Sequence, residues 1–236
     1  QIDDLIIPFD LFCEFMGYWL SDGSTISNSG VVISQQEGET ARDKIVDCIK
    51  RMGFEPHLEK QKVVFYNTTI RNYLKIFGRC INKFVPYVIK NASKRQIRIF
   101  LDAFVLCDGY KRPCRSFIGN HGNEFKSDKD EIIYFTTSER MAGDLSELIL
   151  KSGHRPSFSI NKAGVSHKAN GPIIKSNYDC YSIRECYSVT SSVFNKEIQY
   201  YDGLVYDLTL KRNHIMYIRR NGKCFWGSNC RCYKIP

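Results

Sequence analysis

The chain has 236 residues, 43% hydrophobic and 25% charged, a composition typical of globular proteins and unlike that of disordered or collagen-like chains. The net charge is +9, and no apolar run reaches the roughly 18–20 residues that cross a bilayer, which argues against a membrane protein. This length allows one large domain or two smaller ones.

The first part of the chain predicts helices and strands in alternation. Apolar residues recur at helical spacing from Leu11 to Leu20, and Asp22-Gly23 ends that helix. The following segments read as a strand, an amphipathic helix closed by Gly53, a hairpin or two strands, a short helix and a proline-interrupted linker: 31–36, 39–52, 55–67, 71–77 and 83–90.

The same pattern then starts again. A helix over 97–106 ends at Asp108-Gly109, and a strand over 131–137 precedes a helix over 139–151 that Gly153 closes. Further strands are expected at 157–161 and 178–190. The two copies are offset by 86 residues, which predicts a duplicated domain with pseudo-twofold symmetry rather than a solenoid.

The last part differs in character. Residues 200–220 are rich in Tyr, Val, Ile and Leu, and Asn221-Gly222 is a strong hairpin signal, so β structure is expected there. We therefore expect a boundary near residue 192. The ten cysteines are scattered without a C-x-x-C pair, which favours free thiols in a reducing, cytoplasmic compartment over a secreted protein.

Positive charge is concentrated in one stretch. Residues 60–98 carry ten Lys or Arg and no Asp or Glu, so the remainder of the chain is close to neutral. Aromatic residues lie between these charges, and the combination favours a polyanion such as nucleic acid, since each cation near a phosphate releases counterions. The alternative is a solvated basic surface without a partner.

Two aspartates follow the two apolar helices at matching positions. A small residue, Gly17 or Ala103, precedes each acid by five positions and would let the helices pack closely, bringing Asp22 and Asp108 together. The helix dipole already places partial negative charge at a C-terminus, so two carboxylates there repel unless a divalent cation offsets them. Oxygen ligands and a phosphate substrate favour Mg²⁺.

The segments FMGYWLSDG (15–23) and LDAFVLCDG (101–109) resemble the signature nonapeptide of the LAGLIDADG homing endonucleases. Lys83-Phe-Val-Pro86 is similar to the element before the second motif in intein-borne members, and residues 136–153 resemble the helix block after it. The resemblance covers roughly residues 10–190. It implies an α+β fold in which an αββαββα repeat is duplicated, over about 10–92 and 93–192, and a monomer that acts as a pseudo-dimer.

That family resemblance also implies a function, a metal-dependent double-strand cut in DNA. Asp22 and Asp108 would be the catalytic, metal-binding acids, with the backbone of Gly23 and Gly109 nearby and Lys83 as an accessory catalytic lysine. The polar strand residues Gln35, Gln36 and Lys62 are candidates to read bases. The rest of the predicted DNA surface comes from the basic stretch: Lys60, Arg71, Lys75, Lys90, Lys94, Arg95 and Arg98.

The C-terminal residues resemble the C-terminal splicing blocks of inteins, a mostly β piece of a Hint domain over 193–229. The segment VYDLT (205–209) precedes His214, Asn221-Gly222 and Asn229-Cys230. In splicing, an Asn side chain attacks its own carbonyl and the next residue accepts an acyl group. The resemblance assigns these roles to Asn229 and Cys230, with Asp207 and His214 organising proton transfer and 230–236 beginning the C-extein.

Two departures from the intein pattern are visible. Ser228 precedes the terminal Asn where His is usual, and no N-terminal splicing block or T-x-x-H element is present. Splicing would therefore need a missing N-terminal intein part and the host exteins as partners. Two alternatives remain, namely a catalytically inactive, maturase-like DNA-binding module and a splicing-only intein fragment.

Overall fold

The structure is a computed structural model that describes residues 2–27, 29–113, 116–118, 124–126, 130–167, 173–187, 197–204, 206, 208, 210, 215–220 and 223–228. Helices and antiparallel sheets alternate along these residues, which confirms the predicted α+β class.

The first copy follows the predicted order of helices and strands. Its elements are α1 Phe9–Asp22, β1 Gly23–Thr25, β2 Gly30–Ser34, α2 Thr40–Arg51, β3 His57–Glu59, β4 Lys62–Tyr66 and α3 Thr68–Lys75. The second copy contains α5 Lys94–Asp108, β5 Gly109–Arg112, β8 Glu131–Thr136, α6 Glu139–Lys151, β9 Arg155–Asn161 and β12 Cys180–Cys186.

The two copies have the same sheet topology. In the first sheet the strands lie in the order β1-β2-β4-β3, and in the second the order is β5-β8-β12-β9. Each sheet therefore places its first, second, fourth and third strand side by side, all antiparallel. The duplication predicted from the sequence is confirmed.

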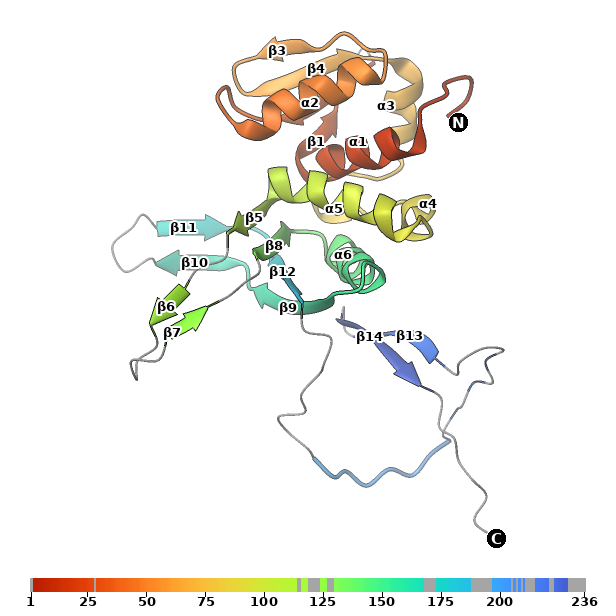
Figure 1. Cartoon of the computed structure of the whole chain (residues 1–236), viewed down its shortest axis with the longest axis vertical. Helices are drawn as coiled ribbons and strands as arrows, with labels where there is room; N and C mark the ends of the chain where they lie inside the picture. Colours follow the sequence, from red (N-terminus) through yellow and green to blue (C-terminus); the bar gives the residue numbers. More distant parts are fainter. Residues whose placement is uncertain are drawn as a thin grey trace.

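The two copies meet through α1 and α5, which lie side by side between the two sheets (Figure 1). A Cβ added at Gly17 would lie 2.6 Å from both the Cβ of Ala103 and the carbonyl oxygen of Phe100, so the backbones touch. The core spreads from this seam under both sheets, with α2 and α6 covering them. Both helices end on the left of Figure 1, where β1 and β5 begin.

We expect Gly17→Ala to destabilise the protein by about 1–2 kcal/mol, because the cost of overpacking exceeds the gain in helix propensity. Urea unfolding measures this change. Lys44→Ala, on the exposed side of α2, is the control and should change stability little. Equal stability of the Gly17 variant and the unaltered protein would contradict the close approach.

Two helices begin three residues before their predicted starts, because polar caps extend them. Asn67 accepts a hydrogen bond from the Ile70 N–H at 2.8 Å and starts α3. Ser93 and Gln96 form a capping box at the start of α5. The linker predicted over 83–90 contains a one-turn helix, α4 Tyr87–Lys90, after a 3-10 turn at Cys80–Asn82.

Six further strands in the described part of the chain were not part of the predicted element set. Two, β1 and β5, are only three and four residues long. Four others form two small hairpins beside the second sheet, namely β6 Ser116–Ile118 with β7 Glu124–Lys126, and β10 Gly164–His167 with β11 Ile173–Ser176. These hairpins project to the left of the molecule in Figure 1.

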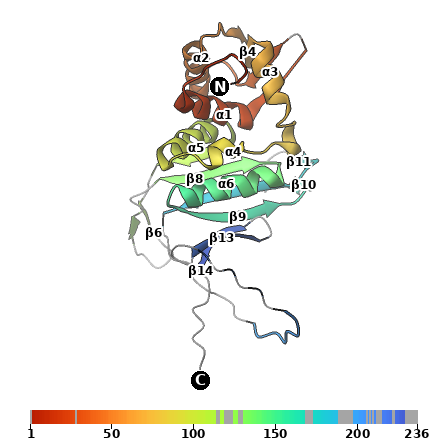
Figure 2. The ribbon, with the colours of Figure 1, turned by 90° about the vertical axis from the view of Figure 1, so that its right-hand side faces the viewer.

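The C-terminal part contains one described hairpin, β13 Ile215–Arg220 with β14 Lys223–Ser228, as Asn221-Gly222 predicts. It lies below β9 in Figure 2 and contacts α6. The prediction of β structure from residue 200 is wrong for the described residues up to 210, which form no strand. Apart from the half-buried Leu210 they are exposed, Tyr200 to 93%. No helix in the described residues is both long and apolar enough to span a membrane.

Candidate active site at the paired helix ends

Asp22 and Asp108 are the last residues of α1 and α5, and a glycine follows each one. A Cβ at Gly23 would lie 2.3 Å from the carbonyl oxygen of Trp19, and one at Gly109 would lie 2.4 Å from the Cγ2 of Val105. The chain therefore turns back against the last helical turn, where only glycine fits. This turn holds each carboxylate at the start of a sheet.

Asp22 is held by a side chain from the neighbouring strand. Gln35, which is buried, donates its amide Nε2–H to Asp22 Oδ2 at 2.7 Å. Burial raises the pKa of the Asp22 carboxyl, while the Gln35 hydrogen bond and the Lys83 charge lower it. The sequence indicated a base-reading role for Gln35, and the contact with Asp22 was not anticipated.

The surroundings of Asp108 favour a charged carboxylate less than those of Asp22 do. Burial raises its pKa to about 6, and the negative charge of Asp22 adds to the rise, while Lys83 acts in the opposite direction. The two acids therefore influence each other, as the paired helix ends predict. An ionised pair at neutral pH carries an unfavourable energy that a cation can relieve.

Lys83 is buried beside both acids and caps the C-terminus of α1. Its Nζ donates to the carbonyl oxygens of Gly23, Trp19 and Ser21, at 2.7, 3.0 and 3.1 Å. An ammonium has three N–H donors, and all three are used here. Burial lowers the pKa of Lys83 to about 8, although Asp108 and Asp22 both favour its charged form.

The acids face two adjoining cavities. One, of about 370 Å³, is lined by Asp22, Asp108, Lys83 and Thr136 among others. The other, of about 440 Å³, is lined by Asp22 together with Gln35, Gln36, Glu39 and Lys62. Asp22 lies at the boundary of both, so a bound polyanion could reach the two acids and the strand residues at once.

The register of the sheets shows that the two halves of the site are not equivalent. Gly23 pairs with Ile33, and Gly109 pairs with Tyr134, so Thr136 occupies the position in the second copy that Gln35 occupies in the first. The Thr136 hydroxyl accepts a hydrogen bond from the Ser138 N–H at 3.2 Å. Asp22 thus has an amide donor from its strand, where the second copy has a short hydroxyl side chain.

We expect Asp108→Asn to stabilise the metal-free protein at neutral pH. The folded-state pKa, about 6, lies above the unfolded value of 3.8, so the folded state binds more protons and stability falls as pH rises through this window. Removing the ionisable group should therefore raise the free energy of unfolding by roughly 2–3 kcal/mol at pH 7.5, and this gain should shrink towards pH 4.

Urea unfolding in a chelator at pH 7.5, 6 and 4.5 measures this effect. Asp43→Asn, at an exposed site on α2, is the matched control and should show no comparable gain. A gain in stability from Asp108→Asn that is the same at every pH would show that ionised Asp108 is not the group that destabilises the folded protein.

The acid pair fits a divalent cation that completes its coordination with substrate and water. Among the residues that the structure describes, no three His, Cys, Asp or Glu side chains are grouped to hold a metal by themselves. The carbonyl of Gly23, predicted near the metal, already accepts from Lys83. Carboxylate oxygens suit Mg²⁺, which usually keeps waters and binds substrate phosphates.

The basic stretch does not form one uninterrupted surface. Four of its cations are paired with acids. Lys90 pairs with Asp144, Arg95 with Asp10 at 2.6 Å, and Arg98 with the buried Glu185 at 2.9 Å. Lys62 forms an exposed pair with Glu59 at 3.1 Å. Together with the buried Lys83, these pairs reduce the charge that is left for phosphates.

The remaining predicted DNA residues are spread over several elements and do not form one group. Gln36 and Lys62 line the cavity at Asp22, and Lys60 follows β3 and is exposed. Arg71 and Lys75 lie on α3, and Lys94 begins α5, at the opposite end from Asp108. The predicted splicing residues Asp207, His214, Asn229 and Cys230 lie outside the described residues.

Comparisons with known proteins give distant likenesses, and no family model matches the chain. A protein of Stigeoclonium helveticum named DNA-directed RNA polymerase subunit beta C-terminal section is 22% identical over 273 residues, covering 97% of this chain and 25% of that protein. An ATP-dependent Clp protease proteolytic subunit of Chlamydomonas moewusii is 26% identical over 162 residues, covering 63% of this chain and 15% of that protein. The chain spans about a quarter or less of these relatives.

Among solved structures, similar chains include mesophilic variants of the homing endonuclease I-DmoI, with a TM-score of 0.45 and 9% identity over 75% of this chain and 89% of that one. A variant of I-DmoI in complex with its target DNA in the presence of Mg gives a TM-score of 0.44 and 10% identity, with the same coverage.

Proposed function

We propose that this chain is a LAGLIDADG-type homing endonuclease that cuts both strands of a DNA target. The observation that carries the proposal is the acid pair, in which duplicated helices bring Asp22 and Asp108 to one cavity. Two carboxylates at adjoining helix C-termini oppose both the helix dipole and each other. A bound cation and phosphate substrate relieve this conflict, which fits phosphodiester hydrolysis.

Asp22 and Asp108 would hold Mg²⁺ in this proposal. The cation, when bound, activates water and stabilises the leaving oxygen. Gln35 keeps the Asp22 carboxylate oriented, since its amide donates to Oδ2 and leaves Oδ1 for a ligand. Lys83 has all its N–H donors on carbonyls, so its contribution is a fixed positive charge beside the acids rather than proton transfer.

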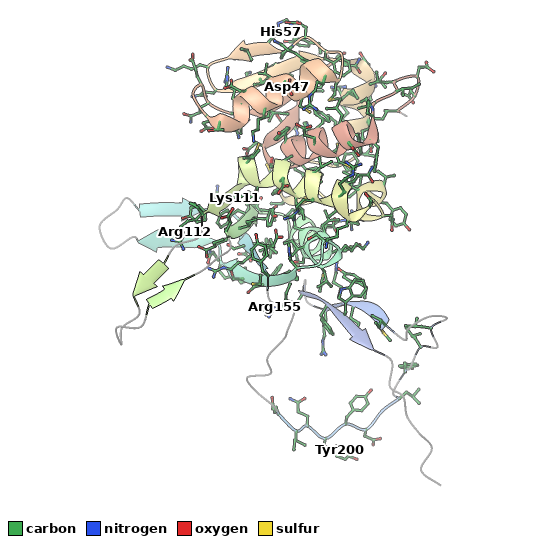
Figure 3. The ribbon with its side chains drawn as sticks, viewed as in Figure 1. Asp47, His57, Lys111, Arg112, Arg155 and Tyr200 are labelled. Atoms are coloured by element: carbon green, nitrogen blue, oxygen red, sulfur yellow. The ribbon has the colours of Figure 1, made fainter. Side chains whose placement is uncertain are left out.

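DNA would lie along the side of the molecule on which the helices end. Gln36 and Lys62 of the first copy line the cavity at Asp22. In the second copy, Lys111 and Arg112 lie on β5 just after Asp108, on the side of the β10–β11 hairpin (Figure 3). These two residues lie outside the predicted basic stretch and form ion pairs, Lys111 with Asp130 at 3.6 Å and Arg112 with Glu131 at 2.5 Å. Lys111 is exposed and Arg112 is partly exposed, and we include them in the proposed DNA surface as groups that phosphates would draw away from these acids.

The salt dependence of DNA binding tests how much of the basic stretch contacts phosphate. Its ten cations would give a log–log slope near −9 if all of them contacted phosphate. Because Lys83, Lys90, Arg95 and Arg98 are engaged within the protein, we expect a slope of about −5. Fluorescence anisotropy with a duplex measures it, and a slope shallower than about −2 would contradict a phosphate-binding surface.

We further propose that the nuclease lies inside an intein, whose C-terminal splicing segment begins near residue 193. The curated relatives carry unrelated names, an RNA polymerase subunit and a protease subunit, and each matches over a quarter or less of its length. A segment shared by unrelated proteins supports an inserted element rather than polymerase or protease chemistry. Asn229 and Cys230 would then act only with an N-terminal splicing part.

Cleavage selection tests the nuclease directly. The protein is incubated with a randomised plasmid library and Mg²⁺, and the new ends are sequenced. We expect one sequence family with staggered double-strand ends, absent in chelator and absent with Asp22→Asn/Asp108→Asn. Specific binding to a sequence family without any cut would favour the inactive, maturase-like alternative, and neither binding nor cutting would overturn the proposal.

A further inference from the structure

A buried acid on α6 lies outside the cavity of the acid pair. Asp144, on α6, has a fully buried side chain. Its Oδ2 accepts the backbone N–H of Val85 at 2.9 Å, and its Oδ1 accepts from Lys90 and, at 3.2 Å, from Arg219. One carboxylate therefore binds the linker before α5 at two points and the C-terminal hairpin at a third.

Comparison of the two copies shows that the helix itself does not require this acid. Gly53 and Gly153 follow α2 and α6 at the same place, so Lys44 is the counterpart of Asp144. Lys44 is exposed, whereas in α6 the linker and the hairpin contact the helix and Asp144 is buried. The buried acid is thus specific to the copy that contacts the linker.

The anchored linker carries Lys83. The Lys83 carbonyl oxygen accepts from the Ser138 hydroxyl at 2.6 Å, and two residues later Val85 binds Asp144. At the other end, the Lys90 carbonyl accepts from Lys151 at 2.6 Å. The backbone of residues 83–90 is therefore fixed to α6, while the Lys83 side chain leaves it to reach the end of α1.

We propose that Asp144 is a positioning residue for the reaction, because it fixes the segment from which Lys83 reaches the acid pair. Without the bond to Val85, the hydrogen bonds left at the start of this segment are those of the Lys83 backbone with Ser138 and Cys80, beside the packing of Phe84 and Val85. Packing alone does not fix the backbone along its length, so the Lys83 ammonium shifts relative to the three carbonyls of α1. As far as cleavage is concerned this inference rests on the proposed function, but the position of Lys83 can be measured without it.

The C-terminal hairpin takes part in this junction. Arg219 also reaches Glu147 at 3.1 Å, and a Cβ at Gly143 would lie 3.2 Å from the Arg219 guanidinium. Cys224 lies 3.6 Å from the Gly143 carbonyl oxygen. The hairpin therefore packs against α6 at Gly143, which has no side chain. Its Arg219 binds the same Asp144 carboxylate that binds the linker.

Trp19 reports where Lys83 is. The Lys83 Nζ lies 5.0 Å from the centre of the Trp19 ring, and the chain has two Trp residues, so Trp226→Phe leaves Trp19 as the single emitter. In that background, the Lys83→Met variant gives the reference spectrum of Trp19 without an ammonium beside its ring. We expect Asp144→Ala to shift the Trp19 emission by at least half of the Lys83→Met shift, measured well below the melting temperature and in chelator.

Glu147→Gln is the matched control, since Glu147 shares Lys90, Lys151 and Arg219 with this cluster but does not bind the linker backbone in the described structure. It should leave the Trp19 spectrum unchanged even if it lowers stability. If Asp144→Ala does not fold, Asp144→Leu replaces it, because its side chain fills the space but cannot accept from the Val85 N–H, and the same shift is expected. A folded Asp144 variant with the spectrum of the unaltered protein would overturn the inference.

Cleavage kinetics give a second readout. On a selected target, Asp144→Ala should lower kcat about tenfold with KM unchanged, since the DNA-contacting surface is untouched. A rise in KM alone would contradict a positioning role. If the unaltered protein cuts no DNA, the proposed function fails, and the Trp19 measurement still decides whether Asp144 positions Lys83.

Discussion

Replacing Asp22 or Asp108 by Asn is expected to abolish double-strand cleavage while leaving DNA affinity unchanged or higher. Asn keeps the size of the side chain but removes the charge that would hold a divalent cation, and it also removes repulsion between the protein and phosphates. A metal-holding acid contributes several kcal/mol to the transition state, so the rate should fall at least about 1,000-fold. Single-turnover cleavage and anisotropy with a selected duplex measure the two quantities.

Glu39→Gln is the control for these acid variants. Glu39 lines the cavity beside Asp22 but is exposed and lies just before α2 rather than at the end of α1 or α5, so its loss should change cleavage little. Cleavage at the unaltered rate by either Asn variant would contradict a shared site. A variant that still nicks one strand would show instead that each acid serves its own strand.

Lys83→Met is expected to lower the free energy of unfolding by about 3–5 kcal/mol and to remove cleavage. The variant leaves three carbonyl oxygens without their donor at a buried helix end, and it takes away the cation between two buried carboxylates. Urea unfolding in chelator at pH 7.5 measures the loss.

Two comparisons sharpen the Lys83 prediction. Lys94→Met, at the exposed start of α5, should leave stability within about 0.5 kcal/mol. Lys83→Met should cost less in an Asp108→Asn background, because one of the two charges that the ammonium offsets is already gone. An unchanged free energy of unfolding for Lys83→Met would show that the ammonium does not close the end of α1.

The main framework of the fold follows from local sequence signals. Apolar spacing and the Asp-Gly ends locate α1 and α5, and Gly17 with Ala103 indicates their close contact. Short strands such as β1 escape prediction because three residues carry no periodicity. The expected β structure is absent from the described residues of 200–210 but present at 215–220, because apolar, β-prone residues form strands only when a neighbouring strand pairs with them.

The acid pair was predictable because both members lie in matched motifs, whereas its supporting contacts were not. Gln35 reaches Asp22 only through the pairing of β1 with β2, which the sequence does not display. The charges of Arg95 and Arg98 seemed available for DNA, yet their partners Asp10 and Glu185 lie more than 80 residues away in the chain. Contacts of this kind depend on tertiary packing.

Metal binding by the acid pair tests the central claim most directly. Mn²⁺ is titrated into the protein bound to a selected duplex, and the free ion is followed by its electron paramagnetic resonance signal. The account predicts that the unaltered protein removes Mn²⁺ from solution at a saturable site and that Asp22→Asn/Asp108→Asn does not, although it binds the same duplex. Equal Mn²⁺ uptake by both proteins would contradict a metal site at the paired helix ends.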